Sequence, residues 1–345
     1  MVEAVVDGAD LEWAAEAAIR QRTGPLLWRA LGMAGLGDRE EILGGRLRAN
    51  ADLWRVQTAM LLPDAVAAAV QPLTDAGLEP LIFKGPTLAE RYPEPGLRPM
   101  DDIDVILPSA QHRTALAALQ RAGWKVLSER AGVHYDTYLS HPKLPGLPLE
   151  LHWDVALWRD RANRLRGKAL WRRRIPISLF GVAAFGLPIE EELVALAAHA
   201  GKPFHHFERL IWSVDISVVI NHGGGSLDWD RLRHTARREK CGTVLAVALN
   251  HAQRFGVAVP DTLIEASTGR TRQAILSPLL NEAWPLTNPD AALRHQLRYA
   301  LSDSWGRQAM LIVGELTNAK PGDVPRAAAR LTRSATRRWR QLRRR

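Results

Sequence analysis

The stretch "RPMDDIDVIL", residues 98–107, places three carboxylates within four positions, directly before an apolar run. Acidic side chains usually spread over solvated surfaces, because like charges repel one another at short range. In an extended strand, successive side chains point to opposite faces. The apolar residues at 103, 105 and 107 would share one face, and Asp102 and Asp104 the other. The pattern predicts a strand with one buried face and one acidic face.

The acidic face has the spacing of a metal site. Asp102 and Asp104 would lie about 6.6 Å apart along the backbone of a strand, close enough for both carboxylates to bind at a common site. Asp101 has the opposite parity, and we assign it to the preceding turn. Carboxylates gathered in this way require cations, and Mg²⁺ is the expected one because it prefers oxygen ligands.

A later stretch, "LPLELHWDV" at residues 147–155, repeats the alternation. Glu150, His152 and Asp154 would share one face of a second strand, opposite the apolar side chains. If this strand and the first one are neighbours in one sheet, Glu150 completes a cluster of three carboxylates. The sequence therefore predicts a sheet that carries its acids on one face.

Hydrophobic periodicity and turn residues predict the surrounding elements. Residues 10–76 have a helical pattern, in which Pro63 and Pro72 mark breaks or kinks. The apolar positions that define this pattern are Leu47, Leu53, Val56, Met60 and Leu61. Further elements are expected as a buried strand at 78–85, a short helix at 86–92, a loop at 92–100, a helix at 109–123 capped by Ser109, and strands at 124–129 and 133–140.

After Arg159 the pattern becomes helical, with long helical segments at 190–221, 228–256 and 291–316. The sequence accordingly divides into four parts. They are an N-terminal helical arm (1–78), an α/β core (79–160), a helical domain (161–325) and a basic Arg-rich tail (326–345).

The net charge of +9 is concentrated at one end of the chain. Residues 326–345 contain nine arginines and no acid, and the rest of the chain has 37 basic and 37 acidic residues. A neutral body argues against a nucleic-acid-binding surface over the whole protein. The tail is expected either to bind RNA or an acidic partner, or to be a solvated terminus.

One cysteine, Cys241, excludes an internal disulfide and fits a reducing cytoplasm. The first residues lack the basic-then-apolar pattern of a signal peptide, and no apolar run approaches the roughly 18 residues of a membrane span. We expect a cytoplasmic protein with no membrane partner.

"LIFKGPTLAERYPEPGLRPMDDIDVILP", residues 81–108, resembles the core signature of the uncharacterised nucleotidyltransferase family in the DNA polymerase β superfamily. The shared pattern is an apolar strand ending in Lys-Gly, a short helix, an Arg-Pro turn and Asp-x-Asp in a strand. The resemblance continues through "LELHWDV" at 149–155 and through the helical segment 193–217. It implies an α/β (α+β) nucleotidyltransferase core with a mixed β-sheet flanked by helices. The hydrophobic pattern adds an N-terminal helical arm and a C-terminal helical domain to this core.

The resemblance also implies an activity, the Mg²⁺- or Mn²⁺-dependent transfer of a nucleoside monophosphate from an NTP such as ATP to an acceptor. Asp102 and Asp104 would hold the metals that bridge the triphosphate. Glu150 would bind the catalytic metal and help to activate the acceptor hydroxyl. Residues expected to bind the nucleotide are Lys84, Gly85, Thr87 and Arg98. For Lys84 and Arg98, ion pairs with neighbouring acids are the alternative.

The chain departs from the wider superfamily at Pro86, which replaces a serine that supplies a hydroxyl and a backbone N–H to the phosphates. Lys84 or Thr87 would have to compensate. A second group, His199, Lys202, His205 and His206, lacks the sequence context of known zinc sites, and we expect these side chains to pack or to hydrogen-bond. Trp212 and Asp215 are expected to pack and cap their helix.

The acceptor class stays open between a small molecule, a peptide and an RNA. Two other functions compete with nucleotidyl transfer. The Arg-rich tail suggests a toxin-like protein that modifies tRNA or another RNA, or a protein that only binds RNA. The third possibility is a non-catalytic scaffold that keeps the fold and binds nucleotide without turnover.

Overall fold

A computed structural model describes residues 11–36, 40–94, 96–129, 135–155, 165–202 and 205–263, together with 276, 297 and 301–303. The chain forms two compact units that are discontinuous in sequence. Unit 1 takes in residues 1–155, 166–189 and 209–223, and unit 2 takes in 156–165, 190–208 and 224–345. Most of the predicted helical segment 291–316 and all of the Arg-rich tail lie outside the described residues, and the division into four parts stays a prediction.

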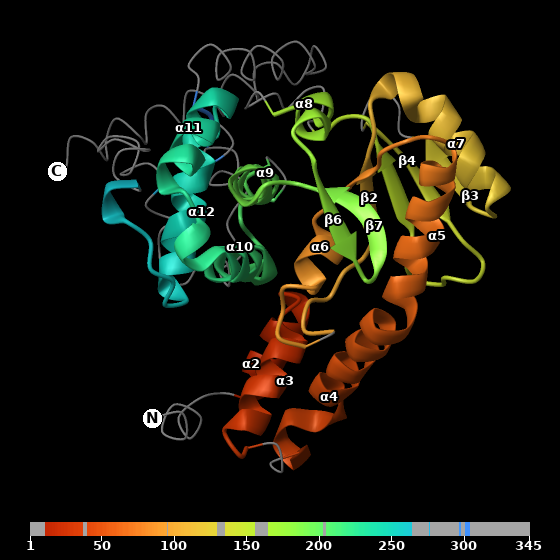
Figure 1. Ribbon diagram of the computed structural model, residues 1–345. Helices are drawn as coiled ribbons and strands as arrows, with labels where there is room; N and C mark the ends of the chain where they lie inside the picture. Colours follow the sequence, from red (N-terminus) through yellow and green to blue (C-terminus); the bar gives the residue numbers. More distant parts are fainter. Residues whose placement is uncertain are drawn as a thin grey trace, which may run out of the picture. The chain divides into compact units, whose positions relative to one another are not determined.

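Unit 1 begins with the predicted arm of helices. The arm helices are α2 (Leu11–Arg20), α3 (Gly24–Met33) and α4 (Glu40–Val56). They share a small apolar core of Ala15, Leu31, Leu36 and Leu47. A π-helical turn, η1 (Gln57–Leu61), joins α4 to α5 (Leu62–Asp75), which begins with Pro63 in its first turn and continues through Pro72. The arm therefore runs directly into a helix of the sheet domain (Figure 1).

The strands that the structure describes form one mixed sheet in the order β3-β4-β5-β2-β1-β7-β6. They are β1 (Leu81–Phe83), β2 (Ile103–Ile106), β3 (Lys125–Glu129), β4 (Asp136–Ser140), β5 (Leu149–His152), β6 (Ile175–Leu179) and β7 (Val182–Gly186). β2 pairs antiparallel with β1 and parallel with β5. The two strands predicted to carry the acids are thus neighbours, and the predicted mixed-sheet α/β fold is confirmed.

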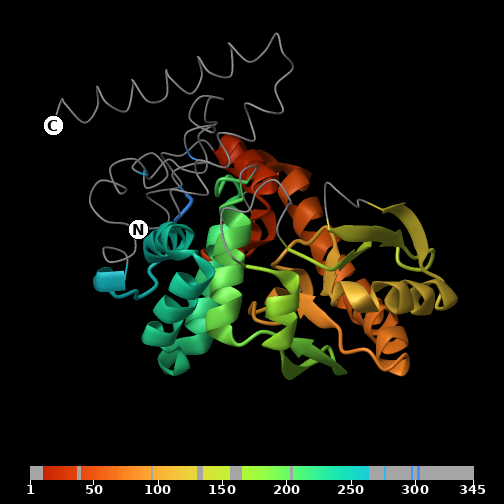
Figure 2. The same ribbon diagram turned by 90° about the horizontal axis from the view of Figure 1, so that it is seen from above.

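One face of this sheet is covered by helices. α5 and α7 (His112–Arg121) lie side by side on it in both views (Figures 1 and 2). The buried core there joins Val66 of α5 and Leu119 of α7 to Ile103, Val105 and Leu151 of the sheet. These strand residues have the parity that the sequence predicts for the apolar face. The acidic side chains of β2 and β5 consequently point to the opposite face.

The remaining helices of unit 1 frame the sheet and its loops. They are α6 (Gly85–Ala89), η2 (Ser109–Gln111), α8 (Gly167–Arg172) and α10 (Leu210–Gly223). α10 packs through Ile211 against Tyr92 and Leu97 in the loop that leads to β2. This contact positions the loop that carries the first acids.

Several predicted elements differ from the structure. The hairpin β6–β7 occupies a stretch after Arg159 where only helices are expected. β6 lies at the edge of the sheet, and most of its residues are exposed. It also contains Pro176, which an edge strand tolerates but which weakens the strand pattern in the sequence. Ser109 begins the 3₁₀ turn η2 and does not cap α7, whose N-cap is Gln111. Leu53 and Met60, two apolar positions of the helical pattern, are exposed.

Unit 2 is helical in its described part. It contains α9 (Ile189–Ala200), η3 (Gly224–Ser226), α11 (Trp229–Glu239) and α12 (Gly242–Arg254). Asp228 caps α11, because its side chain accepts a hydrogen bond from the backbone N–H of Arg231. Across both units, none of the helices within the described ranges has the length and apolar character of a membrane span.

Candidate functional site

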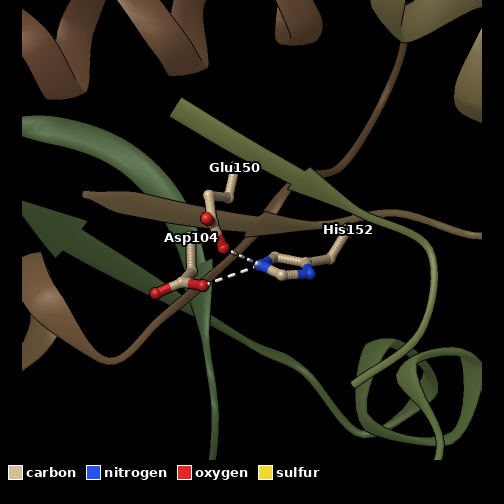
Figure 3. A group of neighbouring side chains, drawn as sticks. All are labelled: Asp104, Glu150 and His152. Atoms are coloured by element: carbon tan, nitrogen blue, oxygen red, sulfur yellow. Dashed lines mark hydrogen bonds and ion pairs between the residues drawn. The ribbon is translucent and has the colours of Figure 1, made fainter. Parts of the chain in front are cut away.

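The register of β2 and β5 brings two carboxylates together. Asp104 lies directly opposite Glu150 in this parallel pair, and Ile106 lies opposite His152. Because paired residues of neighbouring strands point to the same face, Asp104 and Glu150 share the face that is opposite the α5–α7 core. His152 follows Glu150 by two positions and therefore points the same way. Figure 3 shows the three side chains converging from the two strands.

The three side chains are in direct contact. His152 Nε2 lies 2.8 Å from Asp104 Oδ1 and 3.1 Å from Glu150 Oε2, the two contacts dashed in Figure 3. One ligand atom of each residue lies within 4.8 Å of the others. Asp136, opposite His152 on β4, places Oδ2 at 3.8 Å from His152 Nδ1. The imidazole thus joins acids from three neighbouring strands.

Lys84 supplies a second cation to the same cluster. Its Nζ lies 3.0 Å from Asp104 Oδ2, whereas His152 contacts Oδ1 of the same carboxylate. The Lys84 backbone has φ 59° and ψ −126°, a region that an L-residue occupies at a cost of about 1–3 kcal/mol. A strained residue of this kind persists when the contacts around it hold its conformation. Here the strained backbone of Lys84 turns the chain from β1 into α6 beside Asp104.

Gly85 follows Lys84 at the start of α6 and lies against the loop before β2. A Cβ atom at this position would lie 3.1 Å from the backbone oxygen of Asp102. Real Cβ contacts are rarely that short, so a side chain here would push the acidic loop away. Glycine therefore lets the β1–α6 turn and the acidic loop approach each other.

The acids and the two cations of the cluster stabilise one another's charged forms against burial. Burial opposes the charged form of Lys84, but attraction to Asp104 and to its neighbouring acids raises the lysine pKa above the ordinary value. Burial likewise opposes a charged His152, yet its hydrogen bonds to Asp104 and Glu150 raise the imidazole pKa to about 9. Against its own burial, Asp104 has a lowered pKa because Lys84 and His152 stabilise its charge. The protein itself thus supplies two cations to the acids.

Asp102 directly precedes β2 and shares in this electrostatic coupling. Burial and the repulsion of Asp104 raise the pKa of the Asp102 carboxyl to about 7, with Glu150 adding to the shift. Asp102 is not a member of the group whose ligand atoms lie within 4.8 Å of one another. A further positive charge at the site would favour the ionised form of Asp102.

Two other predicted nucleotide-binding residues have partners within unit 1. The Nε and Nη2 atoms of Arg98 donate to the two oxygens of Asp215, each at 3.0 Å. The Tyr92 hydroxyl also donates to Asp215, at 2.7 Å. Thr87 Oγ1 donates to the carbonyl of Lys84 at 2.7 Å and closes the first turn of α6. The ion-pair alternative describes Arg98 in this structure, and phosphate binding by Arg98 stays a prediction.

The prediction that Asp215 caps its helix is wrong. Asp215 lies in the second turn of α10 and is 1% exposed, so its carboxylate serves the ion pair with Arg98. This pair joins residues 117 positions apart. Nothing local in either stretch of sequence indicates it.

The acids next to the cluster have other partners. Asp101, which the parity argument assigns to a turn, lies outside β2 and forms ion pairs with Arg22 and Arg209. Asp154 lies beyond the end of β5, and its Oδ1 accepts hydrogen bonds from the backbone N–H groups of Val155 and Gly167. Asp154 therefore joins the end of β5 to the first residue of α8, although the strand pattern gives it the parity of Glu150.

His152 is the member of this cluster that is absent from the predicted site residues. Its parity already places it on the acidic face. His199, His205 and His206 belong to unit 2, where the rings of His199 and His205 lie 4.7 Å apart. Within the described ranges they form no group of metal-ligand spacing.

A mixed sheet that gathers acids on β2 and β5, beside a Lys-Gly turn, is consistent with the class of α/β nucleotidyltransferase-like folds. The family model of the uncharacterised nucleotidyltransferases matches residues 7–256, and the chain belongs to this family. The match includes the arm, the sheet and the helices up to the end of α12. Comparisons with curated proteins and with solved structures yield no match. Family membership supports nucleotidyl transfer as the general activity.

Proposed function

We propose that this protein is a divalent-metal-dependent nucleotidyltransferase, which moves a nucleoside monophosphate from an NTP to a hydroxyl or similar acceptor. The observation that carries the proposal is the register of Asp104 and Glu150 on neighbouring parallel strands. It puts two carboxylates in one place, next to the turn formed by Lys84 and Gly85. The family match supports the same class of reaction.

The residues present fit a Mg²⁺ or Mn²⁺ site. The donors are carboxylate oxygens, which these hard cations prefer. Burial and the neighbouring Asp104 raise the pKa of Asp102, so a cation bound beside it would favour its charged form. Asp102, Asp104 and Glu150 would hold the metal. When bound, two such ions stabilise the attacking and leaving oxygens of an in-line displacement.

The side chains of the site have separate tasks in this proposal. Lys84, whose pKa is raised, stays protonated and balances negative charge beside Asp104. His152 donates to Asp104 and Glu150 and keeps their carboxylates oriented on the face of the sheet opposite the α5–α7 core. In the transfer, the acceptor oxygen bonds to the α-phosphorus and pyrophosphate leaves. The proton of the acceptor passes to Glu150 or to water.

Labelled nucleotides test the proposal. The protein is incubated with each of the four NTPs, labelled at the α-phosphate or at the γ-phosphate, together with Mg²⁺ or Mn²⁺ and a cell extract that supplies acceptors. Transfer of the α-label without the γ-label, abolished by EDTA, is the expected result. Transfer of the γ-label would identify a kinase and contradict the proposal.

Glu150→Gln separates chemistry from binding once an acceptor is known. This variant keeps the shape of the side chain and removes its charge. We expect single-turnover transfer to slow on the order of 10²-fold or more, with NTP affinity nearly unchanged. Asp104→Asn should weaken both. Wild-type turnover by Glu150→Gln would remove Glu150 from the proposed mechanism.

A further inference from the structure

Two arginines from distant parts of unit 1 converge on the carboxylate next to the acid cluster. Arg22, between α2 and α3, places Nη2 at 2.6 Å from Asp101 Oδ1. Arg209, directly before α10, places Nη1 at 3.8 Å from Asp101 Oδ2. Asp101 precedes Asp102, so the Cα atoms of the two acids are only about 3.8 Å apart. The guanidinium groups therefore lie beside the loop that leads into the proposed metal site.

Both arginines are held in place and yet remain open to solvent. The Arg22 guanidinium lies 5.2 Å from the ring centroid of Trp54, and that of Arg209 lies 5.6 Å from the ring of Trp212. Such stacking restricts a guanidinium without consuming its N–H donors. The side chains of Arg22 and Arg209 are 30% and 50% exposed, and that of Asp101 is 48% exposed. A ligand from solution can reach all three.

The other cations of the site differ in this respect. Lys84 is engaged by Asp104, and Arg98 is engaged by both oxygens of Asp215, with side chains only 16% and 10% exposed. Pro86, at the start of α6, has no N–H to donate to a phosphate. Among these cations of the described residues, Arg22 and Arg209 are the ones whose side chains are accessible to solvent.

We infer that Arg22 and Arg209 form a binding site for the polyphosphate of the nucleotide, and that Asp101 occupies their donors until the polyphosphate displaces it. The inference rests on the proposed function, which it deepens. Ion pairs between exposed side chains contribute little, so Asp101 is a weak competitor. A triphosphate carries several negative charges and offers oxygens that match the planar donor fork of arginine.

The other explanation is that the two ion pairs only hold the Asp101 loop in place. The two explanations predict opposite effects of one substitution. If Asp101 competes with phosphate, Asp101→Asn frees the arginines and does not weaken polyphosphate binding. If Asp101 anchors the loop, Asp101→Asn weakens binding as much as loss of an arginine does.

Titration calorimetry decides between them, with magnesium tripolyphosphate and the Mg²⁺ complexes of ATP, GTP, CTP and UTP as probes. Arg22→Ala and Arg209→Ala should each weaken binding of tripolyphosphate and of the preferred NTP about tenfold, the scale of one charge-assisted contact. Asp101→Asn should leave both affinities unchanged or raise them up to about fivefold. Arg29→Ala is the matched control, since Arg29 pairs with Glu94 at 2.6 Å in the same loop.

Each outcome has one meaning. Wild-type affinity in Arg22→Ala and Arg209→Ala would overturn the inference and leave the proposed function standing. Loss of affinity in Asp101→Asn, equal to that in the arginine variants, would overturn it in favour of the loop anchor. Equal losses in Arg29→Ala would do the same. If the wild-type protein binds none of the magnesium nucleotides, both the inference and the proposed function fall.

Discussion

The buried ion pair of Arg98 with Asp215 is expected to be a main determinant of the stability of unit 1. The pair is bidentate, with both N–O distances at 3.0 Å, and it ties α10 to the loop before β2. Asp215→Asn removes the charge while keeping the size of the side chain. One carboxylate oxygen becomes an amide N–H₂ group that faces the guanidinium. Arg98 is then left as a buried charge without its counter-charge.

The magnitude follows from the burial of the pair. The side chains of Arg98 and Asp215 are 10% and 2% exposed. Removing one partner of a buried ion pair costs about 3–5 kcal/mol. Asparagine keeps one oxygen that accepts from Tyr92 or from Arg98 Nε, so we expect the lower end, about 3 kcal/mol. For a unit of this size that change lowers Tm by about 6–12 °C.

Thermal and urea unfolding measure this loss, with Arg29→Ala as the control. Arg29 and Glu94 also pair between the arm and the loop, but their side chains are 35% and 57% exposed. We expect Arg29→Ala to cost less than about 1 kcal/mol. In a double-mutant cycle, Arg98→Met together with Asp215→Asn should cost less than the sum of the single changes. A loss in Asp215→Asn no larger than that in Arg29→Ala would refute the reasoning.

Three further predictions concern the site, the arm and the tail. Gly85→Ala places a Cβ atom 3.1 Å from the Asp102 backbone oxygen. It should weaken Mg²⁺–NTP binding about tenfold in calorimetry, since small displacements at such sites are costly. Unchanged affinity would show that the loop moves without affecting the site. Leu53→Gln, at a side chain that is 60% exposed, should change the unfolding free energy by less than about 0.5 kcal/mol. Leu47→Ala, in the buried arm core, should lower it by about 2–5 kcal/mol. Equal losses in the two variants would contradict the packing described. Deleting residues 326–345 should remove most salt-sensitive RNA retention on a column without affecting NTP binding, and retention that survives the deletion would place the basic surface elsewhere.

The faces of the two acidic strands could be predicted from the sequence because alternation in a strand is a local property. Parity alone separates Asp104 from the apolar residues of β2, and Glu150 from those of β5. The sequence does not contain the register between the strands. Asp104 lies opposite Glu150 only because residues nearly fifty positions apart pair in parallel. The position of the His152 imidazole between the two carboxylates depends on that register.

Other features depend on contacts that no local pattern reveals. The pairing of Arg98 with Asp215 spans 117 positions. The β6 strand escaped prediction because its residues are mostly exposed and include a proline, which weakens the strand pattern. Helical spacing correctly predicted helices at Leu53 and Met60, but periodicity cannot distinguish a covered apolar face from an exposed one. Tertiary packing decides these cases.

A titration with Mn²⁺, followed by electron paramagnetic resonance, tests the central claim most directly because it requires no acceptor. The wild-type protein, Asp104→Asn and Asp101→Asn are compared in the presence of the NTP that binds the wild type. The account predicts that wild type and Asp101→Asn bind Mn²⁺ together with the nucleotide. Asp104→Asn should lose at least about tenfold in Mn²⁺ affinity, since it removes a charged ligand. Equal Mn²⁺ binding by Asp104→Asn and wild type would contradict a metal-dependent nucleotide site on β2 and β5.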